Sequence, residues 1–163
     1  MSRSIVINRC YGGFSLSKRA VARLAELQGR KVYFFRHVFR LLGSDDDRDS
    51  WVRTTMSDGR RWRAVDTADL SKVNKILSSP SNWNTMTMEE KTAHNTLYNK
   101  HVFETRPDKR DDPLLVQVVK ELGRAASGEC AKLVIVEIPD DAEWKIEEYD
   151  GIEWVAEKHR TWP

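Results

Sequence analysis

The chain has few cysteines, no long apolar run and almost no net charge. Cys10 and Cys130 are its only cysteines, too few for a disulfide framework, and they lack the close pairing that zinc sites use. No segment is long and apolar enough for a signal peptide or a membrane span. These absences predict a cytoplasmic protein in which both cysteines are buried free thiols.

The charge balance excludes a strongly basic duplex binder. Lys and Arg number 27 and Asp and Glu 25, which leaves a formal net charge of +2. A protein that binds duplex nucleic acid normally carries a larger basic excess, because neutralised phosphates supply most of the affinity. Any contact with phosphate must therefore be local. With 163 residues, of which 40% are hydrophobic, we expect a single domain that spans residues 1–163.

The apolar spacing predicts an α+β fold, namely a mixed sheet of about five to seven strands with two main helices on one face and an inserted middle segment at 44–105. The predicted single strands are 4–8, 31–42 and 132–138, the last of a type that is buried on both faces. The predicted helices are 16–28, with Ser15 as N-cap, 67–77, 87–100 and 113–127. The acidic run 44–49 is expected to be a solvated loop.

Two hairpins are expected. The first joins 51–56 to 60–65 through Asp58-Gly59, and the second joins 143–149 to 152–159 through Asp150-Gly151. A two-residue loop in the second hairpin sets Glu148 directly opposite Glu153, and like charges there are unfavourable. A longer loop, or a cation between the two carboxylates, relieves the repulsion.

Two segments carry a resemblance to known proteins: INRCYGGFSLSKRAVARLAE at 7–26 and DPLLVQVVKELGRAASGECAKLVIVEIPDDAEWKIEEYDGIEWVAEKHRTW at 112–162. With these segments the chain resembles a family of small, uncharacterised proteins common in bacteriophage and bacterial genomes. The middle, about 40–105, carries no such likeness. The resemblance implies a viral or accessory setting, in which many proteins of this size block or sequester host defence signals. It implies no catalytic residues.

Three segments are candidates for ligand binding. The first is the turn between strand and helix, where glycines allow close approach of a ligand and free helix N–H groups attract anions. Its candidate residues are Tyr11, Gly12, Gly13, Ser15 and Ser17. The spacing is neither that of a P-loop nor that of a dinucleotide fingerprint, and a tight turn without a ligand is the alternative.

The second candidate is the basic, aromatic segment 51–63, which contains Arg61 and Trp62. Guanidinium groups bind phosphate oxygens and an indole offers a flat face to a base. Alternation places Arg61 and Arg63 on the opposite face from Trp62, and the aspartates at 45–49 are an alternative partner for these arginines.

The third candidate is the C-terminal segment, with Trp154, His159, Arg160 and Trp162. A bulky aromatic end on a charged tail also suits docking onto the domain or onto another subunit.

Support for catalysis is thin. The four histidines lack metal-ligand spacing, no serine lies in a nucleophile elbow, and neither cysteine has a local activating partner. Several glutamates cluster in the last hairpin, where a pair could act as acid and base or hold a divalent cation, although a solvated acidic face is the commoner arrangement. They are Glu147, Glu148, Glu153 and Glu157.

The leading hypothesis is a non-catalytic protein without a cofactor that captures an anionic small molecule, a nucleotide or nucleotide signal. The backbone at Gly12–Ser17 and arginines such as Arg61, Arg106 or Arg160 would contact the phosphate, and a tryptophan or tyrosine would stack on the base. This hypothesis requires these groups to meet at one cavity, which a homo-oligomer could share between subunits. The alternatives are an adaptor or inhibitor that binds a host protein, and a metal-dependent nuclease or hydrolase built on the glutamate hairpin.

Overall fold

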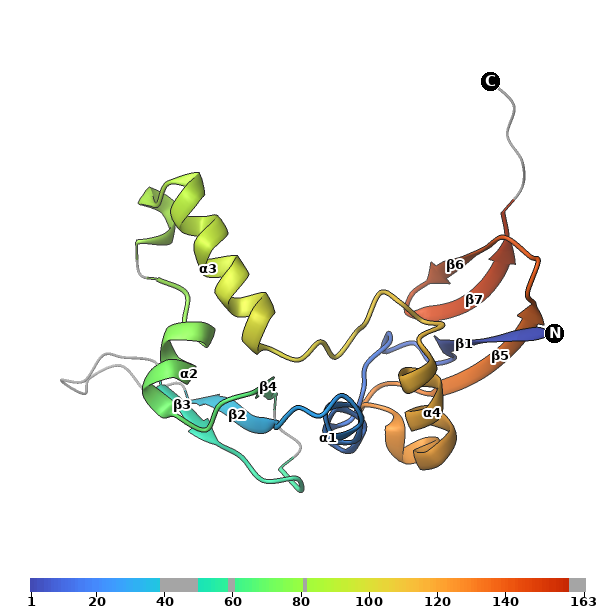
Figure 1. The fold of residues 1–163 in the computed structure, drawn as a ribbon, viewed down its shortest axis with the longest axis horizontal. Helices are drawn as coiled ribbons and strands as arrows, with labels where there is room; N and C mark the ends of the chain where they lie inside the picture. Colours follow the sequence, from blue (N-terminus) through green and yellow to red (C-terminus); the bar gives the residue numbers. More distant parts are fainter. Residues whose placement is uncertain (39–49, 59–60, 81, 159–163) are drawn as a thin grey trace. The chain divides into compact units, whose positions relative to one another are not determined.

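The computed structural model describes residues 1–38, 50–58, 61–80 and 82–158, and it divides the chain into two compact units. Unit 1 combines the two ends of the chain, Met1–Gln28 and Thr105–Pro163, and unit 2 is Gly29–Glu104 (Figure 1). Seven strands and four α-helices lie in the described residues, which confirms the α+β class. The strands form three small antiparallel sheets rather than one mixed sheet.

Unit 1 is built on a pair of antiparallel strands from opposite ends of the chain. Strand β1 (Ser2–Asn8) pairs with β5 (Leu133–Pro139) along its whole length. The β-branched run in β1 is fully buried and suits a pleated strand. Strand β5 has partly exposed residues at most of its positions, so the expectation of burial on both faces was wrong. Its only strand partner among the described residues is β1.

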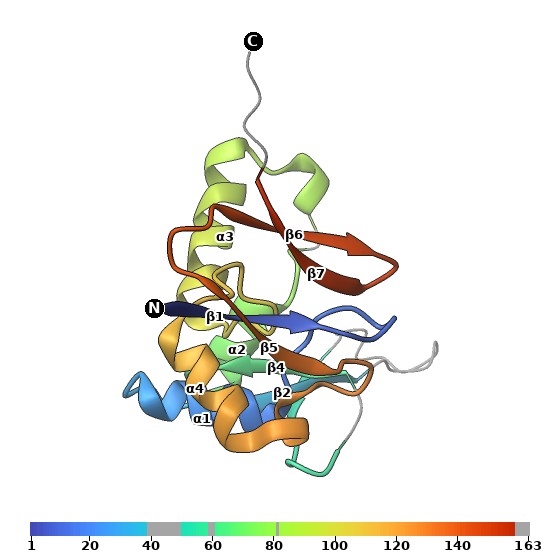
Figure 2. The ribbon, with the colours of Figure 1, turned by 90° about the vertical axis from the view of Figure 1, so that its right-hand side faces the viewer.

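Two helices cover this strand pair. Helix α4 (Pro113–Leu122) packs on β1 and β5, and α1 (Lys18–Leu27) packs on α4. Both views place α4 on one side of the β1–β5 pair and the β6–β7 hairpin on the other (Figure 2). Arg23 of α1 links the helices through an ion pair of 2.8 Å with Glu121 of α4, which holds the pKa of that carboxyl below its usual value.

Helix α4 is shorter than the predicted 113–127. It ends at Leu122. The next residue, Gly123, has a φ of +53°, in the left-handed region that glycine adopts most easily, and a 3₁₀ turn (Gly123–Ala126) begins there. The N-cap of α1 is Ser17 rather than Ser15, because Leu16 forms a β-bridge with Ser127 and keeps the preceding backbone extended.

The last hairpin is confirmed. Strand β6 (Trp144–Tyr149) pairs with β7 (Ile152–Glu157) across a two-residue turn. Asp150 and Gly151 have φ values of +51° and +86°. Positive φ at both central residues is the type I′ geometry, whose twist matches that of the strands.

Unit 2 is a three-stranded sheet with helices packed on one face. Its strands are β2 (Tyr33–Val38), β3 (Ser50–Arg53) and β4 (Arg63–Val65), and its helices are α2 (Leu70–Leu77) and α3 (Met88–His101), with a 3₁₀ turn (Trp83–Thr85) between them. The buried core consists of Phe35, Val65, Val73 and Ile76. The capping box of α3 is present as predicted, with Thr87 and Glu90 exchanging hydrogen bonds.

The first predicted hairpin was wrong. Strands β3 and β4 do not pair with each other, because the aromatic strand β2 lies between them and pairs with both. Phe34 and Phe35 of β2 are both buried, which explains why this strand takes the central position. The acidic run 44–49 lies outside the described residues.

Unit 2 begins at Gly29, so β2 belongs to it together with the segment that we expected to be inserted. That the whole chain folds as one domain stays a prediction. None of the helices in the described residues is long and apolar enough to cross a membrane. Cys10 and Cys130 are free thiols, but Cys130 is exposed and Cys10 half-buried, so the expectation of burial was wrong.

Candidate functional site

The glycine turn of unit 1 is used for close backbone packing. A Cβ atom at Gly12 would overlap the carbonyl oxygen and Cβ of Cys130. A Cβ at Gly151, in the β6–β7 turn, would lie 2.5 Å from the backbone nitrogen of Gly13. Three segments that are distant in the sequence therefore meet here at distances that only glycine allows. Tyr11, by contrast, is 66% exposed.

Several polar groups at the start of helix α1 are hydrogen-bonded within the protein. The Ser17 hydroxyl accepts a hydrogen bond from the N–H of Ala20 (3.1 Å) and donates one to the carbonyl of Ala125 (2.6 Å). The backbone N–H of Ser17 donates to Ala126 O, and that of Leu16 donates to Thr105 O. The N–H groups of Leu16 and Ser17, just before the helix, thus bind backbone carbonyls, and the N–H of Ala20 in its first turn binds the Ser17 hydroxyl.

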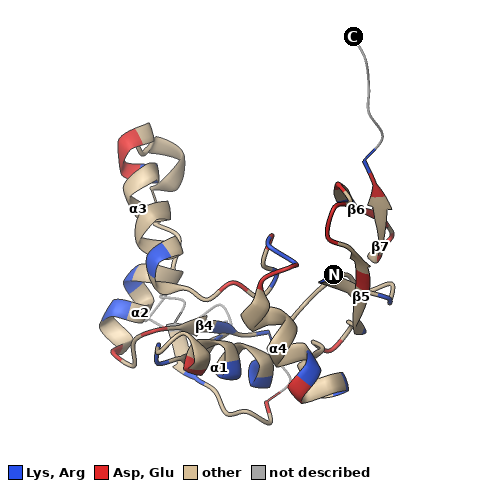
Figure 3. Cartoon of the chain, turned by 45° about the vertical axis from the view of Figure 1, so that its right-hand side comes forward, with Lys and Arg blue, Asp and Glu red and all other residues tan. Residues whose placement is uncertain are grey.

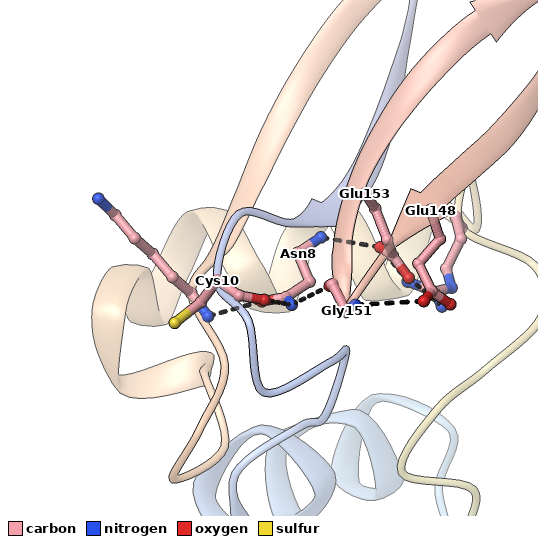
Figure 4. A network of polar contacts seen from close by, with 7 residues as sticks. Asn8, Cys10, Glu148, Gly151 and Glu153 are labelled. Carbon is pink, nitrogen blue, oxygen red and sulfur yellow. Dashed lines mark hydrogen bonds and ion pairs between the residues drawn. The ribbon is translucent and has the colours of Figure 1, made fainter.

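A buried ion pair lies beside this turn. Arg110 donates from both Nη atoms to the carboxylate of Glu153, at 3.1 Å each, and both side chains are nearly buried. The guanidinium also lies 3.6 Å from the centre of the Phe14 ring. Glu153 accepts a third hydrogen bond, from the backbone N–H of Asn8 at 2.8 Å (Figure 4). The carboxylate thus joins β7, the end of β1 and the segment before α4.

The side chain of Asn8 completes the network. Its amide nitrogen donates to the carbonyls of Cys10 and Gly151, and its amide oxygen accepts from the N–H of Lys132 at 2.8 Å. Asn8 is fully buried, and its amide bonds to the turn, to the β6–β7 loop and to the residue before β5 (Figure 4). Each polar atom of this amide has a partner, as the interior requires. The arrangement is a structural junction.

The glutamates of the hairpin do not converge. Glu148 and Glu153 are cross-strand partners, as the sequence predicted, and Arg110 pairs with Glu153, which neutralises one of the two charges. Glu148 accepts instead from the N–H of Gly151, and Glu147 lies on the other face, where it accepts from the Trp154 indole. In the described part of the chain, no group of three or more His, Cys, Asp or Glu side chains is placed to hold a metal ion.

The C-terminal candidates are only partly described. Trp154 is 38% exposed, and its indole Nε1 lies 3.0 Å from the carboxylate of Glu147. His159, Arg160 and Trp162 lie outside the described residues. Arg106 is exposed in unit 1, in the segment between Thr105 and α4.

Unit 2 carries a row of basic residues on its sheet. Phe35 of β2 is directly opposite Arg53 of β3 on one side and Arg63 of β4 on the other. Directly opposite residues in an antiparallel sheet project from the same face, so the two arginines flank Phe35. Both arginines are exposed, and neither forms an ion pair with a carboxylate of a described residue.

Aromatic rings lie beside these arginines, on both faces of the sheet. The guanidinium of Arg53 is 5.2 Å from the centre of the Tyr33 ring, a cation–π distance. Trp62 lies on the opposite face, where it meets the Phe34 ring edge-on at 5.2 Å. Arg61 is exposed and precedes β4. The prediction that Arg63 and Trp62 face opposite ways is confirmed.

The sequence candidates are therefore distributed between the two units. Tyr11, Gly12, Gly13, Ser15, Ser17, Arg106 and Trp154 belong to unit 1, and Arg61 and Trp62 belong to unit 2. The pairing of Arg110 with Glu153 was missed. The signal for it was the unfavourable Glu148–Glu153 pair, which called for a cation but did not say which one. No protein-family model, curated protein or solved structure matches the chain.

Proposed function

We propose that unit 2 binds a phosphate-bearing small molecule of the nucleotide class, held by Arg53 and Arg63. The observation that carries the proposal is the cross-strand row in which these two arginines flank Phe35 on one face of the sheet. Among the described residues neither guanidinium is neutralised by a carboxylate, so both keep their charge available to an anion.

The chemistry of the two side chains suits phosphate. A guanidinium donates two parallel hydrogen bonds to phosphate oxygens and stays charged at physiological pH. The backbones of Arg53 and Arg63 are separated by two strand spacings, about 10 Å. Because Phe35 between them is fully buried against α2, a ligand with more than one phosphate group would have to reach around this covered position to contact both arginines, whereas a single phosphate contacts one of them.

Tyr33 is the candidate for the stacking role. Its ring lies under the Arg53 guanidinium and is only partly buried, so it orients the arginine and leaves part of the ring accessible to a base. Trp62 lies on the other face of the sheet and does not join this set. The turn before α1 in unit 1 is not required, because the N–H groups of Leu16 and Ser17 and the carbonyl of Ser15 are hydrogen-bonded within that unit.

The biological setting of the proposal is that of a phage-type accessory protein in the host cytoplasm. The protein would bind and retain a nucleotide signal without converting it, which would lower the concentration available to a host defence system. What supports this setting is the resemblance of residues 7–26 and 112–162 to a phage and bacterial family, together with the net charge of only +2, which disfavours long nucleic acids.

Isothermal titration calorimetry on the full chain tests the proposal. The ligands are inorganic phosphate, nucleoside mono-, di- and triphosphates, and linear and cyclic dinucleotides. We expect at least one ligand with two or more phosphates to bind, and the double variant Arg53→Ala/Arg63→Ala to weaken it by at least about a hundredfold, since each charged hydrogen-bonding partner contributes roughly 1.5–3 kcal/mol.

The matched control is Arg19→Ala/Arg124→Ala, which removes the same charge from exposed positions of unit 1. This variant should bind as the wild type does, because its two positions lie outside the proposed site. If binding depended only on net charge, both double variants would weaken it equally. Absence of binding to the whole panel, or equal weakening by the two double variants, would show that the row Arg53–Phe35–Arg63 is not a ligand site.

A further inference from the structure

Helix α3 of unit 2 presents an exposed face whose residues suit a second helix. The α-helix runs from Met88 to His101, and none of its residues is fully buried. One side, with Leu97 and Tyr98, packs against the core of unit 2. The other side is an open groove of about 650 Å³ that follows the helix from Met88 and Glu89 to Lys100.

The middle of this face is made of small side chains. Thr92, Ala93 and Thr96 line it, with Leu97 at its margin. Small residues at the contact let two helix axes approach to about 8 Å, near the short end of the usual range. Met88 is 75% exposed at one end, and a flexible apolar side chain of this kind adapts to a partner surface.

The charges on the face are placed symmetrically about the helix midpoint. Glu89 and Lys100 lie at equal distances from it, one at each end, and Figure 3 shows acidic residues at the beginning of α3 and a basic one toward its end. Thr92 and Leu97, and likewise Ala93 and Thr96, are equidistant from the same midpoint.

We propose that this face binds the same face of a second copy of the chain, with the two α3 helices antiparallel about a two-fold axis. A two-fold interface is self-complementary, so residue i meets residue j twice. In this register Glu89 lies opposite Lys100 of the partner subunit, and Ala93 lies opposite Thr96 of the partner subunit. A parallel arrangement would instead bring Glu89 against Glu89, so the charges select the antiparallel one.

The dimer is expected to be weak. A helix of 14 residues is about 21 Å long, and a contact of that length falls at the small end of specific interfaces. We therefore expect a dissociation constant in the micromolar range. This inference is independent of ligand binding, because it rests on α3 and not on the sheet.

Charge reversal with complementation tests the inference. Sedimentation equilibrium of the full chain over micromolar concentrations should show a monomer–dimer equilibrium. Glu89→Lys alone, or Lys100→Glu alone, places like charges opposite each other twice and should weaken the dimer about tenfold. An equimolar mixture of the two variants restores both attractive pairs, so it should regain dimers of wild-type strength.

The mixture also distinguishes an effect of the substitutions on the dimer contact from an effect on the stability of α3. Each single variant loses a favourable interaction with the helix dipole, but mixing cannot repair that loss within one chain. Asn95→Lys, an exposed α3 position outside the groove, is the control and should leave the equilibrium unchanged.

Three outcomes would overturn the proposal. The first is a wild type that stays monomeric throughout the series. The second is a mixture of the two variants that associates no better than either variant alone. The third is a monomer in which the thiol of Thr92→Cys is protected from maleimide, since the chain itself would then cover the face.

Discussion

Arg110 and Glu153 form a nearly buried, two-point ion pair in unit 1, at the place where two glutamates face each other across a hairpin. The pair explains how the hairpin tolerates the two opposed glutamates, and it connects the segment before α4 to β7. Because the carboxylate of Glu153 also binds the backbone N–H of Asn8, the loss of one partner affects three segments.

Arg110→Met should destabilise the protein by about 3 kcal/mol, because it leaves the charge of Glu153 buried without a partner. Urea denaturation measures the loss. Adding Glu153→Gln removes the unpaired charge while keeping an acceptor for the Asn8 N–H. The double variant should therefore be more stable than Arg110→Met alone. Simple addition of the two single losses would show that the pair is not energetically coupled.

Neighbouring glycines of the turn should respond differently to the same substitutions. Gly12→Ala should cost about 1–3 kcal/mol, because the new Cβ meets the backbone of Cys130. Gly13→Ala meets no atom within 4 Å, but its φ of +79° costs about 1–2 kcal/mol for a residue with a side chain.

Asparagine separates the two causes. Asn tolerates positive φ, so Gly13→Asn should recover part of the loss seen with Gly13→Ala, whereas Gly12→Asn should be worse than Gly12→Ala. Thermal denaturation of the four variants provides the comparison. Equal recovery at both positions would mean that contact with Cys130 is not the constraint at Gly12.

Ser17 and Ser15 form a second matched pair. Ser17→Ala removes the cap of α1 and the hydrogen bond to Ala125, and it should cost about 1–2 kcal/mol. Ser15→Ala should change the stability by less than about 0.5 kcal/mol, because its hydroxyl makes no hydrogen bond with another described residue. Chemical denaturation of the two variants measures both values, and the reverse order would assign the cap to Ser15.

The free energy of unfolding at acidic pH should depend on Glu137. Hydroxyls of Ser2 and Ser4 donate to its carboxylate at 2.9 and 2.6 Å and lower its pKa; Ser4 makes the larger contribution. Because the folded-state pKa lies below the unfolded value of 4.5, this stabilisation is complete above pH 4.5 and is lost as the pH falls through the folded-state pKa.

The variant Ser2→Ala/Ser4→Ala should therefore raise the pKa of Glu137 toward 4.5 and flatten this part of the stability curve. An NMR titration of the glutamate carboxyl carbons measures the shift. Glu121 is the internal reference, since Arg23 lowers its pKa and the serine variants leave that pair intact. A Glu137 pKa that does not change would show that the two hydroxyls are not bound to the carboxylate in solution.

Much of the local structure was predictable because its causes are local. The Asp150-Gly151 turn, the capping box at Thr87 and Glu90, and the Asp-Pro start of α4 each depend on residues within a few positions. The first hairpin failed for the opposite reason. Its turn signal was local, but both of its strands pair with the buried aromatic strand β2 instead of with each other.

The candidate sites likewise combine features that the sequence predicted with features that only tertiary packing decided. Residue types alone identified the basic, aromatic segment at 51–63, but the sheet pairing decided that Arg53 and Arg63 share a face and that Trp62 does not. The glycine turn at Gly12 was correctly located, and tertiary packing decided that Cys130 would occupy the space beside it.

By itself, the sequence determined the class of fold, the starts of α3 and α4 and the like-charge conflict between Glu148 and Glu153, since these depend on spacing, capping and alternation. Only the tertiary structure decided that Arg110 resolves the conflict, and that β1 pairs with β5 from the other end of the chain. The physical reason is that a partner distant in the sequence is chosen by which side chains can be buried together, and no local pattern records that choice.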